Sequence, residues 1–362
     1  MGDVGSFLSG VKVLDLSHYI SGPGASQILA DMGAEVVKIE PPAGDGMREL
    51  GPRDADGEPV FYASLNAGKS LRRLDLKSAD GRRAMEGLLV DADVLIEGFR
   101  PGVMTRLGFD YAALAARNPA LIYCSISGYG TEGPLAEAAG HDGNYLAASG
   151  ILDRNGHGRP VFFDPPIADM AGALYAAIAI LGALNARQRT GEGTHIEFGL
   201  ADTLMPLQSI QVAEWGANGT VPTRGSTYLN GAAAYYNIYP TADGRHVMLG
   251  PIEPRFWQAF CLAAKRPDWS VRQGDPLPQN GLIAEISAFF AARTLGEIKV
   301  QFAGADCCLS PVLDLGEALS SDQVRARGLV QRADGALQTL FPATFNGKRT
   351  GPRAPLRREP DA

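Results

Sequence analysis

The 362-residue sequence has few cysteines and few histidines, and none of them are spaced as metal ligands usually are. Its four cysteines include no Cys-x-x-Cys pair, and Cys307 and Cys308 are adjacent, a poor geometry for a mutual disulfide. Its five histidines are scattered along the chain. This pattern predicts a reduced, cytoplasmic protein without structural zinc, and it argues against a metal enzyme.

The sequence also lacks a positive charge excess and a long apolar run. Its net charge of −7 argues against a general nucleic-acid binder. The longest charge-free apolar stretch, residues 170–184, is shorter than the roughly 20 residues of a membrane span, and polar residues border it. We therefore expect a buried core helix there, and no association with a membrane. The first ten residues show no basic region followed by an apolar one, so we expect no secretory signal.

Two common catalytic or binding motifs are missing. Gly-x-Ser-x-Gly does not occur, which weakens a hydrolase interpretation. The sequence Gly22-Pro23-Gly24 begins a dinucleotide-type motif, but Gln27 stands where a third small residue is needed. Nicotinamide binding is therefore not favoured.

The first half of the chain alternates apolar runs with helical patterns, which predicts a parallel sheet covered by helices. We expect a turn at 21–24 and strands at 11–16, 35–40, 72–77, 92–97, 121–127 and 194–200. We expect helices at 25–32, 79–90, 111–117 and 168–187. The fold class is therefore α/β, with a doubly wound parallel sheet.

The pattern changes past residue 200. A helical stretch within 201–224 is expected to act as a linker, and residues 225–320 are expected to form a smaller α+β domain with a hairpin at 234–239 and 246–249. The tail from 321 to 362 is expected to pack back on the first domain, residues 1–200.

Two side chains are the best candidates for proton transfer at carbon. Such a reaction needs a base that can be neutral near pH 7 and a second group that returns the proton. His141 lies in an expected polar turn between Gly140 and Asp142, and Asp169 opens the long apolar helix. A loop histidine can also be a simple hydrogen-bonding residue, Asp142 a turn residue, and Asp169 a helix cap. The positive end of a helix would keep Asp169 ionised in either role.

Charged residues outside this pair suggest an orienting group and an anion site. Glu253 stands between prolines in Gly250-Pro251-Ile252-Glu253-Pro254, which fix its backbone, although it could be an ordinary exposed carboxylate. Basic residues recur near predicted strand ends, and they could bind a phosphorylated ligand or be scattered surface charge. They are Lys38, Arg72, Arg73, Lys77, Arg100 and Arg106.

Several segments together resemble the family III (CaiB/BaiF-type) CoA-transferases, and within them the α-methylacyl-CoA racemase branch. They are 10–16, Gly22-Pro23, 29–40, 75–77, 93–102, Gly140-His141-Asp142 and Asn144-Tyr145. The resemblance runs over almost the whole chain. It implies a large Rossmann-like CoA-binding domain, a smaller α+β domain, and an interlocked homodimer with each active site between two chains.

The resemblance also implies roles for particular residues. An acyl-CoA thioester is the substrate, and no separate cofactor is needed. His141, oriented by Glu253 of the other chain, would serve one face of the α-carbon and Asp169 the other. The helix start at Asp169–Met170 would donate N–H groups to the enolate oxygen. The residues expected to bind CoA are Lys38, Leu74, Lys77, Gly98, Phe99, Arg100, Arg106 and Tyr145.

The resemblance leaves a choice between two reactions. Family transferases use the aspartate at position 169 as a nucleophile and carry a glycine run in the small domain. Residues 230–236 here read Asn-Gly-Ala-Ala-Ala-Tyr-Tyr, without that run, whereas the Gly-His-Asp and Ile-Glu-Pro motifs of the racemases are both present. This favours a 2-methylacyl-CoA racemase. The alternatives are a CoA-transferase with an Asp169 acyl intermediate and a non-catalytic acyl-CoA-binding protein.

Overall fold

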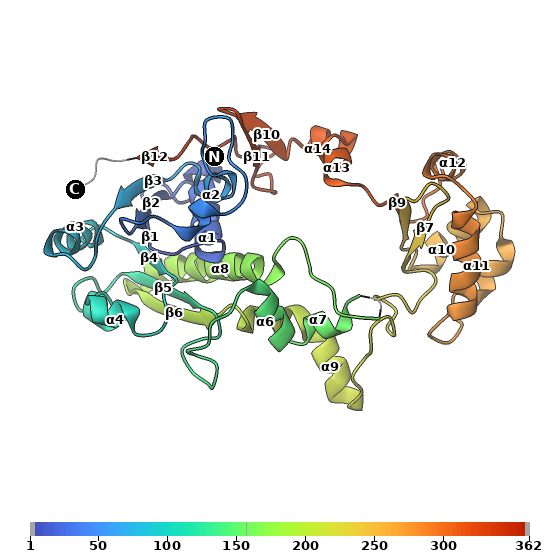
Figure 1. Ribbon diagram of the computed structural model, residues 1–362, viewed down its shortest axis with the longest axis horizontal. Helices are drawn as coiled ribbons and strands as arrows, with labels where there is room; N and C mark the ends of the chain where they lie inside the picture. Colours follow the sequence, from blue (N-terminus) through green and yellow to red (C-terminus); the bar gives the residue numbers. More distant parts are fainter. Residues whose placement is uncertain (1–3, 157, 359–362) are drawn as a thin grey trace. The chain divides into compact units, whose positions relative to one another are not determined.

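The computed structural model describes residues 4–156 and 158–358 (Figure 1). The described residues fall into two compact units. The first comprises residues 4–149, 163–209 and 323–358, and the second comprises 150–156, 158–162 and 210–322. The first unit thus runs a little past the predicted limit at residue 200, and it is completed by the C-terminal part of the chain.

A parallel sheet forms the centre of the first unit, and in the described part of the chain it has seven strands. Their order is β12 (Arg357–Arg358), β3 (Ser70–Arg73), β2 (Glu35–Glu40), β1 (Lys12–Asp15), β4 (Val94–Glu97), β5 (Ile122–Ser127) and β6 (Thr194–Gly199). Neighbouring strands all pair in parallel. Because the order reverses between β1 and β4, ligands are expected to bind beyond the carboxyl ends of these two strands.

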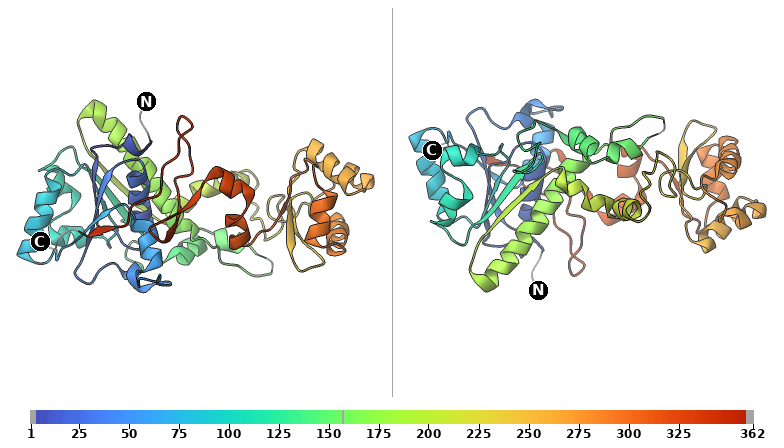
Figure 2. Two further views of the ribbon diagram at one scale, coloured as in Figure 1. Left: turned by 90° about the horizontal axis from the view of Figure 1, so that it is seen from above. Right: turned by 90° about the horizontal axis from the view of Figure 1, so that it is seen from below.

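Helices cover both faces of this sheet, as the doubly wound fold requires. On one face α1 (Ser21–Asp31) packs against α8 (Ile167–Thr190), and both contact the sheet (Figures 1 and 2). On the other face, Met85 of α3 (Ala79–Leu89) and Leu114 of α5 (Tyr111–Ala115) join a common apolar core with the strands. The α/β prediction is confirmed.

Helix α8 is long and apolar enough to cross a membrane by length and composition alone. Half of its apolar window is buried inside the protein, where small residues such as Ala173 and Ala176 allow close packing. That burial is typical of a core helix.

The predicted turn at 21–24 is wrong, because these residues form the first turn of α1. Proline is tolerated in the first turn of a helix, and the two glycines serve close packing. A Cβ at Gly22 would lie 2.0 Å from Ser17 Oγ, and one at Gly24 would lie 3.0 Å from the Ala173 Cβ.

Three other expected elements differ from the structure. The strand predicted at 72–77 is shifted to β3, and the polar turn around His141 leads directly into a short helix, α6 (Asp142–Ala148). The expected helix within 201–224 is interrupted. It consists of two 3-10 turns, Asp202–Leu204 and Pro206–Gln208, followed by α9 (Ser209–Asn218). Pro206 explains the break, since it cannot donate a helical hydrogen bond.

The second unit is built on a small antiparallel sheet. The expected hairpin is present as β7 (Asn237–Pro240) and β8 (His246–Leu249), and β9 (Leu309–Pro311) pairs with β8. An aromatic core that includes Trp257, Phe260 and Trp269 lies between the sheet and its helices. The helices include α10 (Pro254–Ala263), α11 (Asn280–Ala291) and α12 (Leu295–Gln301).

The described part of the C-terminal tail packs on the first unit. Its strand β12 pairs with β3, and β10 (Val330–Ala333) forms a hairpin with β11 (Ala336–Thr339). Arg353 binds both carboxylate oxygens of Asp31 at 2.6 Å, which fixes the tail against the end of α1.

Candidate active site

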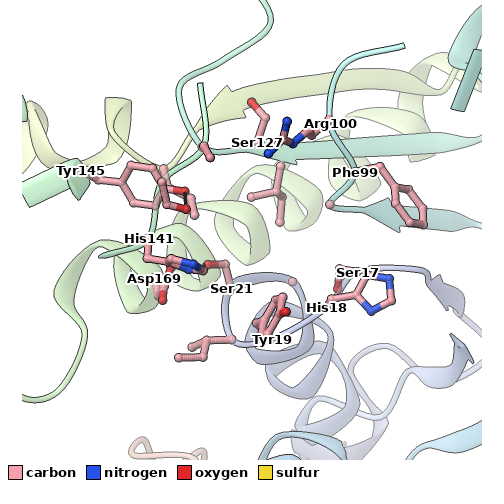
Figure 3. Close-up of a pocket in the computed structure, with 18 of the residues that line it drawn as sticks. Ser17, His18, Tyr19, Ser21, Phe99, Arg100, Ser127, His141, Tyr145 and Asp169 are labelled. Atoms are coloured by element: carbon pink, nitrogen blue, oxygen red, sulfur yellow. Dashed lines mark hydrogen bonds between the residues drawn. The ribbon is translucent and has the colours of Figure 1, made fainter. Parts of the chain in front are cut away.

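A cavity of about 660 Å³ lies at the point where the strand order of the large sheet reverses (Figure 3). The segment after β1, Ser17 to Gly22, and the segment after β4, Gly98 to Pro101, line it together. The start of α6 and the first turn of α8 complete the wall with His141, Tyr145 and Asp169. The two proton-transfer candidates therefore share one cavity within the first unit.

Asp169 lies in the first turn of α8 with its side chain toward the cavity (Figure 3). Its Oδ1 accepts a hydrogen bond from the Ser21 hydroxyl at 3.2 Å. Burial, and then the charge of Asp142, raise the pKa of Asp169 to about 6, against the opposing effects of Ser21 and His141. A carboxyl group with this pKa can both accept and return a proton near neutral pH.

Asp142, and not Asp169, caps the start of α8. The backbone N–H groups of Ala168 and Asp169 donate to Asp142 Oδ1 at 2.7 and 3.2 Å. The sequence left open whether Asp169 is a helix cap and whether Asp142 is only a turn residue. In the structure Asp142 is the residue that caps α8. This contact also corrects a prediction about the enolate site. The N–H of Asp169 is already engaged, and that of Met170 donates to Pro166 O at 3.1 Å.

His141 is the residue that precedes α6, and its backbone is fixed by that position. Its N–H donates to Asn144 Oδ1 at 3.0 Å, a capping contact that starts the helix. Its side chain is exposed and lies beside that of Asp169 (Figure 3). The ring is thus accessible from the cavity while its backbone is held.

Tyr145 forms a buried part of the same wall. Its hydroxyl donates to Gly140 O at 2.7 Å, and its ring meets that of Tyr129 edge to face. A Cβ at Gly140 would lie 2.8 Å from the Tyr145 ring, so glycine is required before His141. Burial, and then the charge of Asp169, raise the pKa of Tyr145 to about 12, so its hydroxyl stays protonated.

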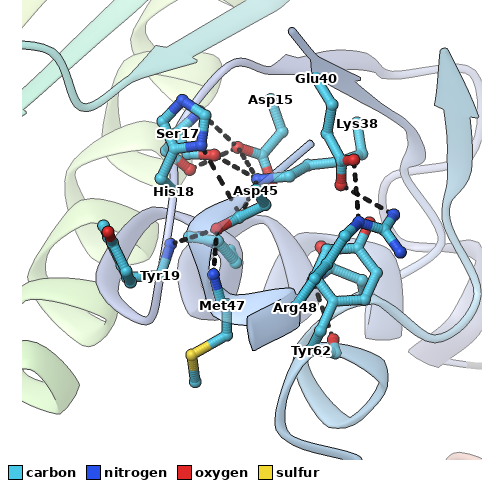
Figure 4. A network of polar contacts seen from close by, with 12 residues as sticks. Asp15, Ser17, His18, Tyr19, Lys38, Glu40, Asp45, Met47, Arg48 and Tyr62 are labelled. Carbon is cyan, nitrogen blue, oxygen red and sulfur yellow. Dashed lines mark hydrogen bonds and ion pairs between the residues drawn. The ribbon is translucent and has the colours of Figure 1, made fainter. Parts of the chain in front are cut away.

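A buried polar network supports the segment after β1 (Figure 4). Burial alone would raise the pKa of Asp15, but Lys38, Lys69 and two serine hydroxyls outweigh it and lower that pKa. Ser17 donates its N–H to Asp15 Oδ1 at 3.0 Å. The network therefore fixes the start of the cavity wall.

Lys38 was expected to help bind CoA, but it is not accessible to a ligand in this structure. Its side chain is fully buried, and its ammonium contacts Asp45 at 3.2 Å and the Ser17 carbonyl. A buried cation must be paired, and these oxygens satisfy it. Leu74, also expected to contact CoA, is 4% exposed and belongs to the core.

The other predicted CoA contacts lie in two places. Gly98, Phe99, Arg100 and Tyr145 line the cavity, whereas Lys77 and Arg106 are exposed and are not among its described lining residues. Phe99 donates its N–H to Glu97 at 2.9 Å, and its ring contacts His18 edge to face at 5.6 Å between centroids.

Glu253 belongs to the second unit, where it immediately precedes α10 and is exposed. Its pairing with His141 remains a prediction, because the two residues lie in different units. In the same unit, Ala232, Ala233 and Ala234 occupy the place of the glycine run and are fully buried. Gln279 binds this segment, donating its N–H to Ala232 O and accepting from Ala234 N, both at 2.9 Å.

Sequence reasoning missed several residues around the cavity, including Ser17, His18, Tyr19 and Ser21. Among the described residues, no cluster of His, Cys, Asp or Glu could hold a metal ion. Open parallel α/β sheets bind their ligands where the strand order reverses. The cavity of this protein lies at that point and has acid–base groups on its wall, so the protein is of the ligand-binding α/β class.

The chain belongs to CoA-transferase family III, whose family model matches residues 8–360. Acetyl-CoA:oxalate CoA-transferase of Acetobacter aceti is 32% identical, covering 93% of this chain and 89% of that protein. Human α-methylacyl-CoA racemase is 34% identical, covering 89% of this chain and 81% of that protein. The crystal structure of a CaiB/BaiF family protein from Brucella suis has a TM-score of 0.86 and 29% identity, over 97% of this chain and 96% of that one.

Proposed function

We propose that the protein is a racemase that inverts C2 of a 2-methylacyl-CoA thioester through an enolate. The observation that carries this proposal is the presence of His141 and Asp169 on the wall of one cavity. Asp169 has a pKa of about 6, because burial and Asp142 raise it, so it can hold or release a proton at neutral pH. A two-base reaction needs these properties.

The reaction balances as a transfer between two bases. Neutral His141 removes the proton from C2, and the electron pair of the C–H bond moves onto the thioester carbonyl to give the enolate. Protonated Asp169 then gives its proton to C2 from the opposite face, which inverts the centre. In the reverse direction the ionised Asp169 is the base and the His141 imidazolium is the acid.

The enolate oxygen needs hydrogen-bond donors, and the N–H groups of Asp169 and Met170 that were expected to serve it are already engaged. We assign this role to the first turn of α1, whose Ser21 and Gly22 line the cavity. The first N–H groups of a helix lack partners within it. Among the described residues no other backbone group accepts from these two N–H groups. They carry the positive end of the α1 dipole, which favours a developing anion.

The phosphates of CoA are assigned to three exposed cations of the first unit. Arg100 lines the cavity, and Lys77 and Arg106 lie on the same unit. No hydrogen bond or ion pair within the described chain engages the guanidinium group of Arg100 or Arg106, which supports their availability for an anion.

We also propose a homodimer in which Glu253 of one chain orients His141 of the other. One face of α8 supports a partner surface, because Met170, Leu174 and Ile178 follow one another at helical spacing and are 40%, 53% and 62% exposed. Apolar side chains gathered on one face commonly mark a protein contact.

The second candidate is a CoA-transferase that uses Asp169 as a nucleophile. It is favoured by the similar identity of a transferase relative and the racemase relative. The buried alanines at 232–234 argue for racemisation, since their backbone is fixed by Gln279 and lacks the freedom of a glycine run.

One assay separates the candidates. A racemase exchanges the C2 hydrogen of a 2-methylacyl-CoA with deuterium from heavy water, without any acceptor acid. A transferase turns over only with an acceptor, and hydroxylamine traps an acyl group on Asp169. Tight CoA binding without exchange or transfer would instead indicate a non-catalytic protein. Absence of exchange across a panel of 2-methylacyl-CoA thioesters would overturn the proposed reaction.

A further inference from the structure

Ser21 contacts the carboxylate of Asp169 from a different helix. It is the first residue of α1, it is 7% exposed, and it lines the cavity. Its hydroxyl donates to Asp169 Oδ1 at 3.2 Å. Among the described residues no other side chain donates a hydrogen bond to this carboxylate. The hydroxyl is therefore placed to act on the proton-transfer group itself.

The position of this hydroxyl is fixed from several sides. Before it, the N–H of Tyr19 donates to Asp45 Oδ1 at 3.3 Å, and after it, the N–H of Gly24 closes the first helical turn on Ile20 O at 2.7 Å. On the α8 side, a Cβ at Gly172 would lie 3.5 Å from the Ser21 side chain. Ser21 is thus packed between its own helix and α8, with little room to turn away.

Asp169 is also influenced by charged and polar groups at the start of α6. Asp142 and His141 lie at the start of α6, and Tyr145 follows them on the same helix. Asp142 disfavours the carboxylate, whereas His141 and the Ser21 hydrogen bond favour it. A hydrogen bond to the charged form of an acid stabilises that form.

We propose that Ser21 is a positioning residue that holds Oδ1 of Asp169 and stabilises its ionised form, leaving Oδ2 to exchange the proton with substrate. The catalytic use of this contact rests on the proposed proton transfer. The effect of Ser21 on the ionisation of Asp169 does not, because it can be measured in the protein without substrate. With Oδ1 occupied by a donor, the proton of the acid form resides on Oδ2. Ser21 thereby fixes which oxygen reacts, and it keeps Asp169 from remaining protonated at neutral pH.

The test is a titration of Asp169 in the intact, substrate-free protein. Aspartate labelled with carbon-13 at its carboxyl group is incorporated, and the Asp169 signal is assigned by its loss in Asp169→Asn. In Ser21→Ala we expect the titration midpoint to rise by about one pH unit. Ser21→Thr keeps the hydroxyl and should restore the midpoint. Ser64→Ala is the matched control. The Ser64 hydroxyl is exposed and donates a hydrogen bond to Phe61 O, and it has no contact with Asp169.

The outcomes separate this inference from the proposed function. An unchanged midpoint in folded Ser21→Ala, or an equal shift in Ser64→Ala, would overturn the role of Ser21 even if the wild type exchanges its C2 hydrogen. A raised midpoint restored by Ser21→Thr supports the role even if no 2-methylacyl-CoA exchanges. Where exchange occurs, the acid limb of its pH profile should move upward with the midpoint in Ser21→Ala, and a profile that did not move would contradict the inference.

Discussion

The Asp142 carboxylate accepts the backbone N–H of Asp169, at 3.2 Å, while its charge disfavours ionisation of the Asp169 side chain. One side chain therefore has two effects on the same helix end. As a hydrogen-bond acceptor it stabilises the start of α8, and as an anion it raises the proton affinity of the residue that α8 presents to the cavity. The capping interaction and the tuning of the acid are combined in Asp142.

Two substitutions of Asp142 should separate these effects. In Asp142→Asn an amide oxygen still accepts the N–H groups of Ala168 and Asp169, but the charge is gone, so the pKa of Asp169 should fall. In Asp142→Ala the cap is lost as well, and the free energy of unfolding should fall by about 1–2 kcal/mol. Urea unfolding measures the loss of the cap, and the acid limb of the pH–rate profile measures the change in the pKa of Asp169. Equal loss of stability in both variants would show that the cap is not the source of the stability.

Asp169 should make the protein less stable as the pH rises. Its ordinary pKa is 3.8, and burial followed by Asp142 raises it to about 6 in the folded state. Between about pH 4 and 6 the folded state binds more protons than the unfolded state, so the free energy of unfolding falls as the pH increases through this window. Above it the ionised carboxylate remains a cost.

The variant Asp169→Asn removes that cost and should be more stable at pH 7 by about 1–2 kcal/mol, after allowance for partial exposure. The gain should vanish below about pH 4, where the carboxyl is protonated in both states. Urea unfolding of both proteins from pH 3.5 to 7.5 measures it. Asp56→Asn, at an exposed loop position, is the control substitution. A gain that persists at pH 3.5 would contradict the electrostatic explanation.

The order of strands and helices along the chain could be predicted from sequence because the central strands contain runs of apolar residues. Val94-Leu95-Ile96 is an example, since all three side chains are fully buried. The start of α1 could not be predicted, because Gly22 and Gly24 are typical of turns. In this helix they are needed because Ser17 and Ala173 approach the backbone too closely for a larger side chain. That requirement is set by residues distant in the sequence.

The candidate site was only partly predictable for the same reason. His141 and Asp169 could be found from residue type and resemblance, and the structure places both on one cavity. Lys38 was misplaced because a lysine in a strand usually reaches solvent, whereas here Asp45 allows its full burial. The roles of Asp142 and Ser21 depend on contacts across 27 and 148 positions, which no local pattern reveals.

Loss of His141 should stop the reaction without releasing the substrate. In His141→Ala the C2 exchange rate should fall by at least about 10²-fold, the usual contribution of a general base. Affinity for CoA, measured by calorimetry, should change little, because the cations assigned to the phosphates are untouched. His246→Ala, an exposed strand residue of the second unit, is the control and should exchange normally. A large loss of CoA binding in His141→Ala would mean that His141 contacts the CoA moiety itself.

Two glycines of α8 allow a test of the helix contact that supports the site. A Cβ at Gly172 would lie 2.3 Å from Leu200 Cδ2, whereas one at Gly182 would meet nothing within 4 Å. Gly172→Ala should therefore lower the free energy of unfolding by about 1–3 kcal/mol through overpacking, and it should slow C2 exchange by displacing Ser21 from Asp169.

Gly182→Ala should raise the free energy of unfolding by about 0.5–1 kcal/mol, because alanine has the higher helix propensity and no clash offsets it. Urea unfolding midpoints of the two variants, measured with the wild type, give opposite signs if α8 packs as described. A stabilised Gly172→Ala with unchanged exchange would show that Leu200 moves aside freely, and that the close approach of α8 to Ser21 and Leu200 is not needed for the reaction.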